Sequence, residues 1–147
     1  MKDPITAEKR PLDILLIDDD DMDARAVERA FRKAKIGNTI IRAMDGMEAL
    51  EMLKGENGRT KPPSPCIMLV DLNMPRMNGI EFVQALRDDR ELQRSIVFIL
   101  TTSKRDEDKI AAYDLNVAGY IAKATAEDDI RNLVSLLDSY GRIVELP

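Results

Sequence analysis

Histidine is absent from this chain of 147 residues, and cysteine occurs only once, as Cys66. Without histidine, the chain cannot form a Ser-His-Asp or Cys-His catalytic system, and it cannot ligate zinc through imidazole. Any phosphohistidine chemistry must therefore use a histidine of another molecule. The single cysteine excludes an internal disulfide, and because Cys66 begins an apolar run we expect it to pack rather than to react.

Long apolar runs and clusters of basic residues are also missing. No run approaches the roughly 20 residues that cross a bilayer, and the polar N-terminus does not resemble a signal peptide. The formal net charge of −5 argues against a nucleic-acid surface, because phosphate contacts need clustered Lys and Arg. We therefore expect a cytoplasmic protein with neither a membrane nor a nucleic acid as its partner.

Five short apolar runs alternate with stretches in which apolar residues recur at three- and four-residue steps. The runs predict strands at 12–17, 39–43, 66–70, 95–100 and 117–122. The other stretches predict helices that end near residues 35, 55, 87, 113 and 138. This alternation predicts an α/β fold, a (βα)5 doubly wound parallel five-stranded sheet with helices on both faces. We expect a flexible leader at 1–11, one domain at 12–138 and a C-terminal extension at 139–147.

Three of the predicted helices begin with a capping signal, an N-cap residue followed three positions later by an acid. The pairs are Asp45 with Glu48, Ser103 with Asp106, and Thr125 with Asp128. Each pair predicts the residue at which its helix starts.

Polar residues follow four of the five predicted strands. They are Asp18 and Asp19 after the first strand, Asp71 after the third, Thr101 after the fourth and Lys123 after the fifth. Because parallel strands end at one edge of a sheet, we expect these side chains to gather there. Carboxylates this close repel one another and favour a hard divalent cation such as Mg²⁺. A metal and a lysine around one carboxylate describe a site at which Asp71 attacks a phosphoryl group.

Plainer interpretations stand beside this one. Asp71 can simply begin a turn, and a lysine such as Lys123 is more often a surface residue than a ligand. The remaining acids of the first acidic run, Asp20, Asp21 and Asp23, are expected to be solvated surface. The coincidence of the strand ends favours the phosphoryl site.

At this point the chain resembles the receiver domain of two-component response regulators, from about Leu12 to Asp138. The resemblance rests on residues in the family's order and approximate spacing, namely Asp18-Asp19, the block Asp71-Leu72-Asn73-Met74-Pro75 with Gly79, Thr101, Tyr120 and Lys123. It implies the flavodoxin-like strand order 2-1-3-4-5. It also implies a protein that catalyses only its own phosphorylation and dephosphorylation, and is otherwise not an enzyme.

The resemblance assigns a role to each of these residues. Asp71 is the phosphoacceptor. The Mg²⁺ ligands are Asp19, Asp71 and the main-chain carbonyl of Asn73, with Asp18 holding metal-bound water. Lys123 and Thr101 bind the phosphoryl group. Thr101 and Tyr120 form the switch that changes the surface around the fourth helix, fifth strand and fifth helix, although Tyr120 also fits a simple edge-strand aromatic.

One residue departs from the family pattern. Ala124 follows Lys123, where the family usually has a proline in a cis peptide. A non-proline cis bond costs about 2.5 to 4 kcal/mol, so we expect either a trans bond with a shifted loop or a strained one. Lys123 is then less well aimed, which leaves open a receiver fold that no longer accepts phosphate.

A narrower resemblance concerns the loop 55–65 and the apolar tail Ile143, Val144 and Leu146. Both are similar to single-domain regulators that work with bacterial phytochrome histidine kinases, in which a C-terminal extension helps to form a homodimer. This implies a sensor histidine kinase as partner, with a bacteriophytochrome as one candidate, and a homodimer through the fourth helix, fifth strand, fifth helix and tail.

A different class of function remains as an alternative. In a Mg²⁺-dependent phosphohydrolase, Asp18 would be the nucleophile and Asp20 the acid. Met22 stands where the motif of such enzymes has Thr or Val, and 147 residues leave little room for a substrate cap.

Overall fold

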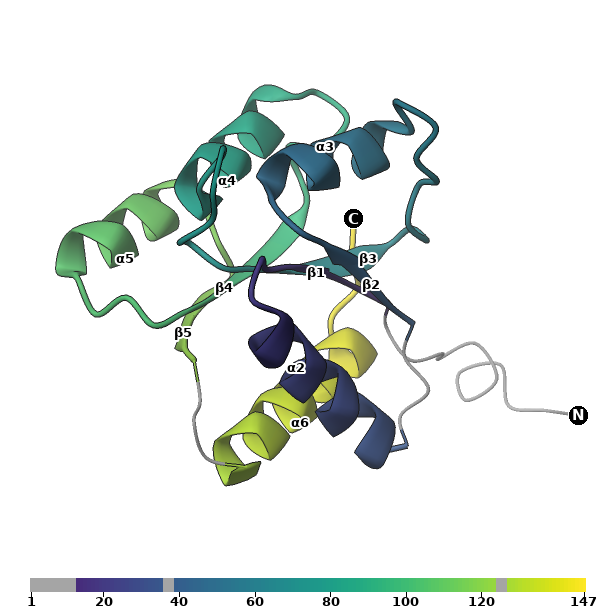
Figure 1. Cartoon of the computed structure of the whole chain (residues 1–147), viewed down its shortest axis with the longest axis vertical. Coiled ribbons are helices and arrows are strands. Elements are labelled where there is room, and N and C mark those ends of the chain that lie inside the picture. The colour runs from purple at the N-terminus through teal and green to yellow at the C-terminus, as the bar shows by residue number, and fades with distance from the viewer. Residues whose placement is uncertain (1–12, 36–38, 124–126) are drawn as a thin grey trace, which may run out of the picture.

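The computed structural model describes residues 13–35, 39–123 and 127–147 (Figure 1). The strands are β1 (Asp13–Ile17), β2 (Ile40–Ala43), β3 (Cys66–Val70), β4 (Ile96–Thr101) and β5 (Gly119–Ala122). The helices are α2 (Asp21–Lys33), α3 (Gly46–Lys54), α4 (Gly79–Asp88), α5 (Asp106–Asp114) and α6 (Glu127–Ile143). Strands and helices therefore alternate along the chain, as predicted.

The five strands form one parallel sheet in the order β2-β1-β3-β4-β5, which confirms the predicted fold and strand order. The central strands β1 and β3 are almost wholly buried. A strand that is covered on both faces needs apolar residues at successive positions, which explains the continuous apolar runs in the sequence.

Helices cover both faces of the sheet, with α3, α4 and α5 on one face and α2 and α6 on the other (Figure 1). Because successive side chains of a strand point to opposite faces, Leu15 and Ile17 pack into the core beneath α3 and α4. Ile14 and Leu16 pack into the core beneath α2 and α6. Two hydrophobic cores thus hold the sheet rigid beneath its polar edge.

The helix starts agree with the capping signals in one case and differ in another. The carboxylate of Asp45 accepts from the main-chain N–H of Glu48, as predicted. The prediction for Ser103 and Asp106 is wrong, because α5 has Arg105 at its N-cap and no side-chain cap. The Ser103 hydroxyl donates to Asp108 instead, at 2.5 Å. The predicted cap at Thr125 lies outside the described residues.

Helix α5 is weakly anchored compared with its neighbours. Of its nine residues only Ala112 is buried, while Ile110 and Tyr113 are largely exposed. By contrast, α4 buries Gly79, Phe82, Val83 and Leu86.

The last helix is longer than the sequence predicted. It continues to Ile143, and the ring of Tyr140 packs edge-on against Phe98 with centroids 5.2 Å apart. Beyond it, Leu146 packs against the core beneath α2 and α6, whereas Ile143 is exposed. Within the described ranges, no helix has the length and apolar character that a membrane span requires.

Candidate functional site

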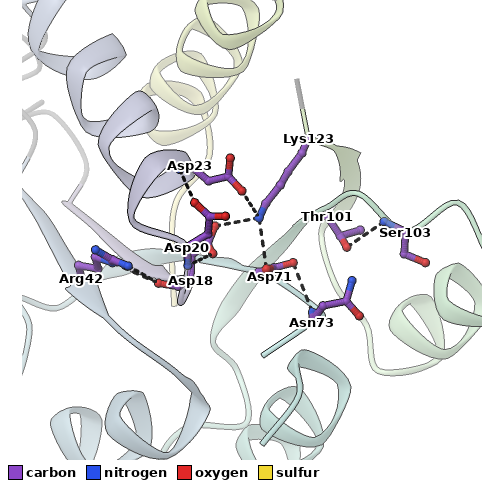
Figure 2. Close-up of polar contacts among 9 residues, drawn as sticks. All are labelled: Asp18, Asp20, Asp23, Arg42, Asp71, Asn73, Thr101, Ser103 and Lys123. Atoms are coloured by element: carbon purple, nitrogen blue, oxygen red, sulfur yellow. Dashed lines mark hydrogen bonds and ion pairs between the residues drawn. The ribbon is translucent and has the colours of Figure 1, made fainter. Parts of the chain in front are cut away.

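Four of the predicted site residues meet at the carboxyl edge of the sheet. Asp18 and Asp71 follow β1 and β3 directly, Thr101 ends β4 and Lys123 follows β5 (Figure 2). Main-chain hydrogen bonds continue the strand pairing past the strand ends, from Asp71 N–H to the Ile17 carbonyl (3.0 Å) and from Lys123 N–H to the Thr101 carbonyl (2.8 Å). The parallel register therefore fixes where these side chains begin.

Three carboxylates form a group that suits a metal ion. Asp18, Asp19 and Asp71 each offer one oxygen, and these oxygens lie within 4.8 Å of one another. Asp18 and Asp71 are buried, with 2% and 6% of their surface exposed, whereas Asp19 is exposed. Carboxylate oxygens that are partly open to water are the donors that a hard divalent cation prefers, so the residues present fit such an ion.

The ammonium group of Lys123 lies among three carboxylates. Its Nζ is 2.8 Å from Asp23, 3.0 Å from Asp18 and 3.2 Å from Asp71, as Figure 2 shows. Although burial favours the neutral amine, the hydrogen bonds to Asp23 and Asp18 raise the pKa of Lys123 above its usual value. Lys123 is therefore charged, and it belongs to the site rather than to the solvated surface.

The surroundings of Asp18 disfavour the ionised form of its carboxyl group. Burial raises the pKa of the Asp18 carboxyl, and the neighbouring charge of Asp71 adds to this effect. The N–H of Asp20 and the ammonium of Lys123 oppose it without overcoming it. A further positive charge at this position would hence stabilise the ionised site.

Arg42 of β2 fixes the loop that carries the acids. Its guanidinium donates twice to the main-chain carbonyl of Asp18, at 3.1 and 3.0 Å, and pairs with the Asp21 carboxylate at 2.6 Å. Nothing in the sequence signalled this residue, because β2 and the acidic loop meet only in the folded sheet.

The prediction that Asp20, Asp21 and Asp23 are solvated surface is confirmed for Asp20 and Asp21, which are exposed, and is wrong for Asp23, which pairs with Lys123. Asp20 caps α2 by accepting from the N–H of Asp23, Asp21 pairs with Arg42, and Asp23 reaches Lys123. The sequence pattern of an acidic residue in a first helical turn is the same whether its side chain faces water or pairs with a lysine far along the chain.

The loop after Asp71 requires glycine at position 79. A Cβ atom there would lie 2.5 Å from the carbonyl oxygen of Asp71 and 2.8 Å from the Cα of Leu72. The Gly79 N–H also donates to the Leu72 carbonyl at 2.9 Å. Only glycine permits this approach, which brings the start of α4 against the chain at the end of β3.

Arg76 and Asp45 join this loop to α3. The guanidinium of Arg76 contacts Asp45 through Nε at 2.9 Å and Nη2 at 2.5 Å. Although burial favours the neutral carboxyl, the Glu48 N–H and Arg76 hold the pKa of Asp45 below its ordinary value. Asn73 lies in the same loop, and its N–H donates to Asp71 at 3.3 Å. Its main-chain carbonyl stays a predicted metal ligand.

Thr101 and Tyr120 both contact Ser103. The buried Thr101 hydroxyl accepts from the Ser103 N–H at 3.1 Å (Figure 2), and the Tyr120 hydroxyl donates to the Ser103 carbonyl at 3.3 Å. The half-buried Tyr120 also packs against the core beneath α3 and α4. The sequence pattern indicates Ser103 only as a helix cap. The bond between Lys123 and Ala124 lies outside the described residues.

Comparison with known proteins gives a consistent family. The sequence matches the response regulator receiver domain family over residues 14–135. It is 32% identical over 130 residues to response regulator Rcp1 of Synechocystis sp., with 88% of each chain covered.

Solved structures agree with this match. The phosphorylated cyanobacterial phytochrome response regulator RcpA is similar with a TM-score of 0.83 and 28% identity, over 94% of this chain and 99% of that one. The Mn²⁺-bound form of response regulator Rcp1 gives 0.79 and 30% identity, over 93% and 99%.

The strand order, the acidic group at the sheet edge and the family match all agree with the predicted resemblance. The family match extends over β1 to β5, so it includes every strand end that carries a site residue. This chain therefore belongs to the response regulator receiver domain family of two-component systems.

Proposed function

We propose that the chain is a phosphoacceptor switch in which Asp71 accepts a phosphoryl group from a histidine kinase. The observation that carries the proposal is the position of Asp71, a buried carboxylate at the sheet edge beside Asp18, Asp19 and the ammonium of Lys123. A carboxylate held between a metal-binding group and a lysine is arranged to attack phosphorus and to have the product charge offset.

The transfer forms one bond and breaks another. A carboxylate oxygen of Asp71 attacks the phosphorus of a phosphohistidine, and the P–N bond breaks as its electron pair returns to the imidazole nitrogen, which takes up a proton. The donor is another molecule, because this chain contains no histidine. Lys123 pairs with the phosphoryl oxygens. Water later hydrolyses the aspartyl phosphate.

We propose Mg²⁺ as the metal, held by Asp19, Asp71 and the main-chain carbonyl of Asn73, with Asp18 holding metal-bound water. When bound, it offsets the negative charge that gathers around the phosphoryl group. Support for a divalent cation comes from the oxygen group of the three aspartates and from the Mn²⁺-bound form of Rcp1.

The switch begins at Thr101. The phosphoryl group adds charge and acceptor oxygens, to which the Thr101 hydroxyl donates. Because Thr101 and Tyr120 both contact Ser103, a shift of Thr101 moves the attachment point of the Tyr120 hydroxyl. The Tyr120 ring then changes its burial, and with it the surface formed by α5, β5 and α6.

The kinase that we propose as partner is of the phytochrome type, in the cytoplasm. The likeness to the cyanobacterial phytochrome response regulator RcpA supports this. We further propose that 12–138 form the receiver unit behind a leader at 1–11, and that the extension 139–147 joins α5, β5 and α6 in a homodimer. The exposed Ile143 supports a contact there. No nucleic acid or membrane is proposed as a partner.

The two alternatives have less support. A phosphohydrolase would need Asp18 as a free nucleophile, whereas one Asp18 oxygen accepts from the Asp20 N–H and the other pairs with Lys123. A receiver that no longer accepts phosphate was suggested by Ala124. The placement of Lys123 beside Asp71 favours a competent site instead.

Intact mass measurement with acetyl phosphate and Mg²⁺ tests the proposal. The wild type gains one phosphoryl group, Asp71→Asn gains none, and the matched surface variant Asp114→Asn behaves as the wild type. Size-exclusion elution of each sample shows whether dimerisation follows phosphorylation. Absence of any gain in the wild type, or a gain that persists in Asp71→Asn and disappears in Asp18→Asn, would contradict the assignment.

A further inference from the structure

Asp23 reaches the phosphoryl site from a helix rather than from a strand end. It lies in the first turn of α2, and its carboxylate makes the shortest of the three Lys123 contacts, 2.8 Å (Figure 2). The Asp23 side chain is 44% exposed, whereas that of Lys123 is 11% exposed. Asp23 therefore lies at the mouth of the site, with Lys123 beneath it.

The three carboxylates around Lys123 differ in what else they do. Asp18 and Asp71 belong to the oxygen group that suits a metal ion, and Asp71 is also the proposed phosphoacceptor. Asp23 is outside that group. Once a cation and a phosphoryl group occupy the site, the charges of Asp18 and Asp71 are shared with them. Asp23 is then the one of these three carboxylates that pairs with Lys123 and with neither the cation nor the phosphoryl group.

The main chain holds Asp23 firmly. Its N–H donates to the carboxylate of Asp20 at 3.0 Å, and the N–H of Asp20 donates to Asp18 at 2.9 Å. These bonds connect the metal-binding loop to the first turn of α2. The distance between Asp23 and the rest of the site is consequently fixed by the fold.

A carboxylate partner such as Asp23 can fix the direction of the Lys123 side chain. Its four-carbon stem is flexible, and an ammonium group has no fixed fork geometry of its own. The main-chain N–H of Lys123 donates to the Thr101 carbonyl. The next residue is Ala124, whereas a proline at that position would restrict the backbone. The Asp23 carboxylate of α2 therefore directs the Lys123 ammonium group, which the backbone next to Lys123 does not do.

We propose that Asp23 is a positioning residue whose carboxylate holds the Lys123 ammonium where it pairs with the phosphoryl group on Asp71. The inference rests on the proposed function and adds a residue to it. Because Nζ carries three donors, one can pass from Asp71 to a phosphoryl oxygen while another stays on Asp23.

The first test is the rate of phosphoryl gain from acetyl phosphate at saturating Mg²⁺. Asp23→Asn removes the charge at constant size, and we expect the rate to fall about two- to fivefold, the scale of a partly exposed ion pair. Glu28→Gln is the matched control, since it removes one negative charge from the same helix; its rate stays at the wild-type value. Asp23→Glu, which keeps the carboxylate, restores part of the loss.

The second test repeats Asp23→Asn in a Lys123→Ala background. If Asp23 acts by holding Lys123, its replacement has no further effect there. An equal fall in both backgrounds, or a rise in rate because a negative charge near the anionic donor is gone, overturns the inference. Thermal melting of each variant separates these results from a general loss of stability.

The proposed function and the role of Asp23 can fail separately. A wild type that gains no phosphoryl group, or gains it elsewhere than Asp71, removes the proposed function and the inference with it. A wild type that is modified on Asp71 at the same rate as Asp23→Asn leaves the function standing and overturns the role of Asp23 alone.

Discussion

Two partly buried cations of this molecule, Lys123 and Arg87, are held in opposite ways. Lys123 lies among three carboxylates at the sheet edge, and its pKa is raised. Arg87, near the end of α4, donates to four main-chain carbonyl oxygens at 2.7 to 3.1 Å, those of Gln93, Ser95, Leu115 and Asn116. Burial lowers the pKa of Arg87.

The difference distinguishes Lys123, which acts in the proposed phosphoryl site, from Arg87, which stabilises the fold. Carbonyl oxygens are part of the main chain, so the acceptors of Arg87 stay with it as long as the loops around residues 93–95 and 115–116 are folded. Carboxylates carry charge that an arriving metal ion or phosphoryl group can take over. Lys123 can therefore change partners, whereas Arg87 ties α4 to its neighbours.

The largest effect is expected at Lys123. Replacing it with alanine should slow phosphoryl gain by about 10²-fold, because a charge aimed at the phosphoryl oxygens is lost. The rate from acetyl phosphate, followed by intact mass, measures this. Lys104→Ala, at an exposed lysine of the loop after β4, serves as the control and should keep the wild-type rate. A Lys123→Ala rate within twofold of the wild-type rate would contradict the functional role that distinguishes Lys123 from Arg87.

Arg87 should show the reverse behaviour. Arg87→Ala leaves four carbonyl oxygens without their donor, and we expect the free energy of unfolding to fall by about 2 to 4 kcal/mol. Phosphoryl gain by the folded fraction should stay unchanged. Urea unfolding measures the loss, with the exposed neighbour Arg90→Ala as control. The distinction between the two cations fails if Arg87→Ala lowers the rate of phosphoryl gain more than it lowers stability.

The Asp45–Arg76 pair sharpens the comparison with a smaller effect, since its cation is 57% exposed. Asp45→Asn removes the negative charge of the pair but keeps a side-chain oxygen that caps α3, and it should cost about 1 kcal/mol at pH 7. Because folding lowers the pKa of Asp45, its contribution is fully present above about pH 4 and is lost as the pH falls through the lowered value. The stability difference between wild type and Asp45→Asn should therefore shrink on acidification. A difference that is constant down to pH 3 would contradict this.

The strand ends were predictable from sequence for a simple physical reason. An apolar run that stops at a polar residue marks both the strand and the edge at which it ends, so Asp71, Thr101 and Lys123 could be brought together without coordinates. Contacts made by side chains across long separations could not. Asp23 and Lys123 are 100 positions apart, and their meeting depends on how α2 leaves the sheet.

The prediction for the last helix, with an end near residue 138, fell short because packing overrides local propensity. Gly141 lowers helix stability by roughly 1 kcal/mol relative to alanine. Tyr140 more than offsets this by packing against Phe98, and the helix continues to Ile143. An aromatic contact between a helix and a distant strand leaves no periodic signal in the sequence.

The weak anchoring of α5 sets how the molecule can respond. Moving a helix that buries little more than one alanine forfeits about 1 kcal/mol of apolar burial. A single new charge-assisted hydrogen bond to the phosphoryl group contributes more free energy than this loss of burial. In the proposed switch, phosphorylation can hence displace α5 at the loss of Ala112 from one core, while the other members of both cores stay packed. A partner that binds the exposed Ile110 and Tyr113 would then detect the position of a helix, not the modified aspartate.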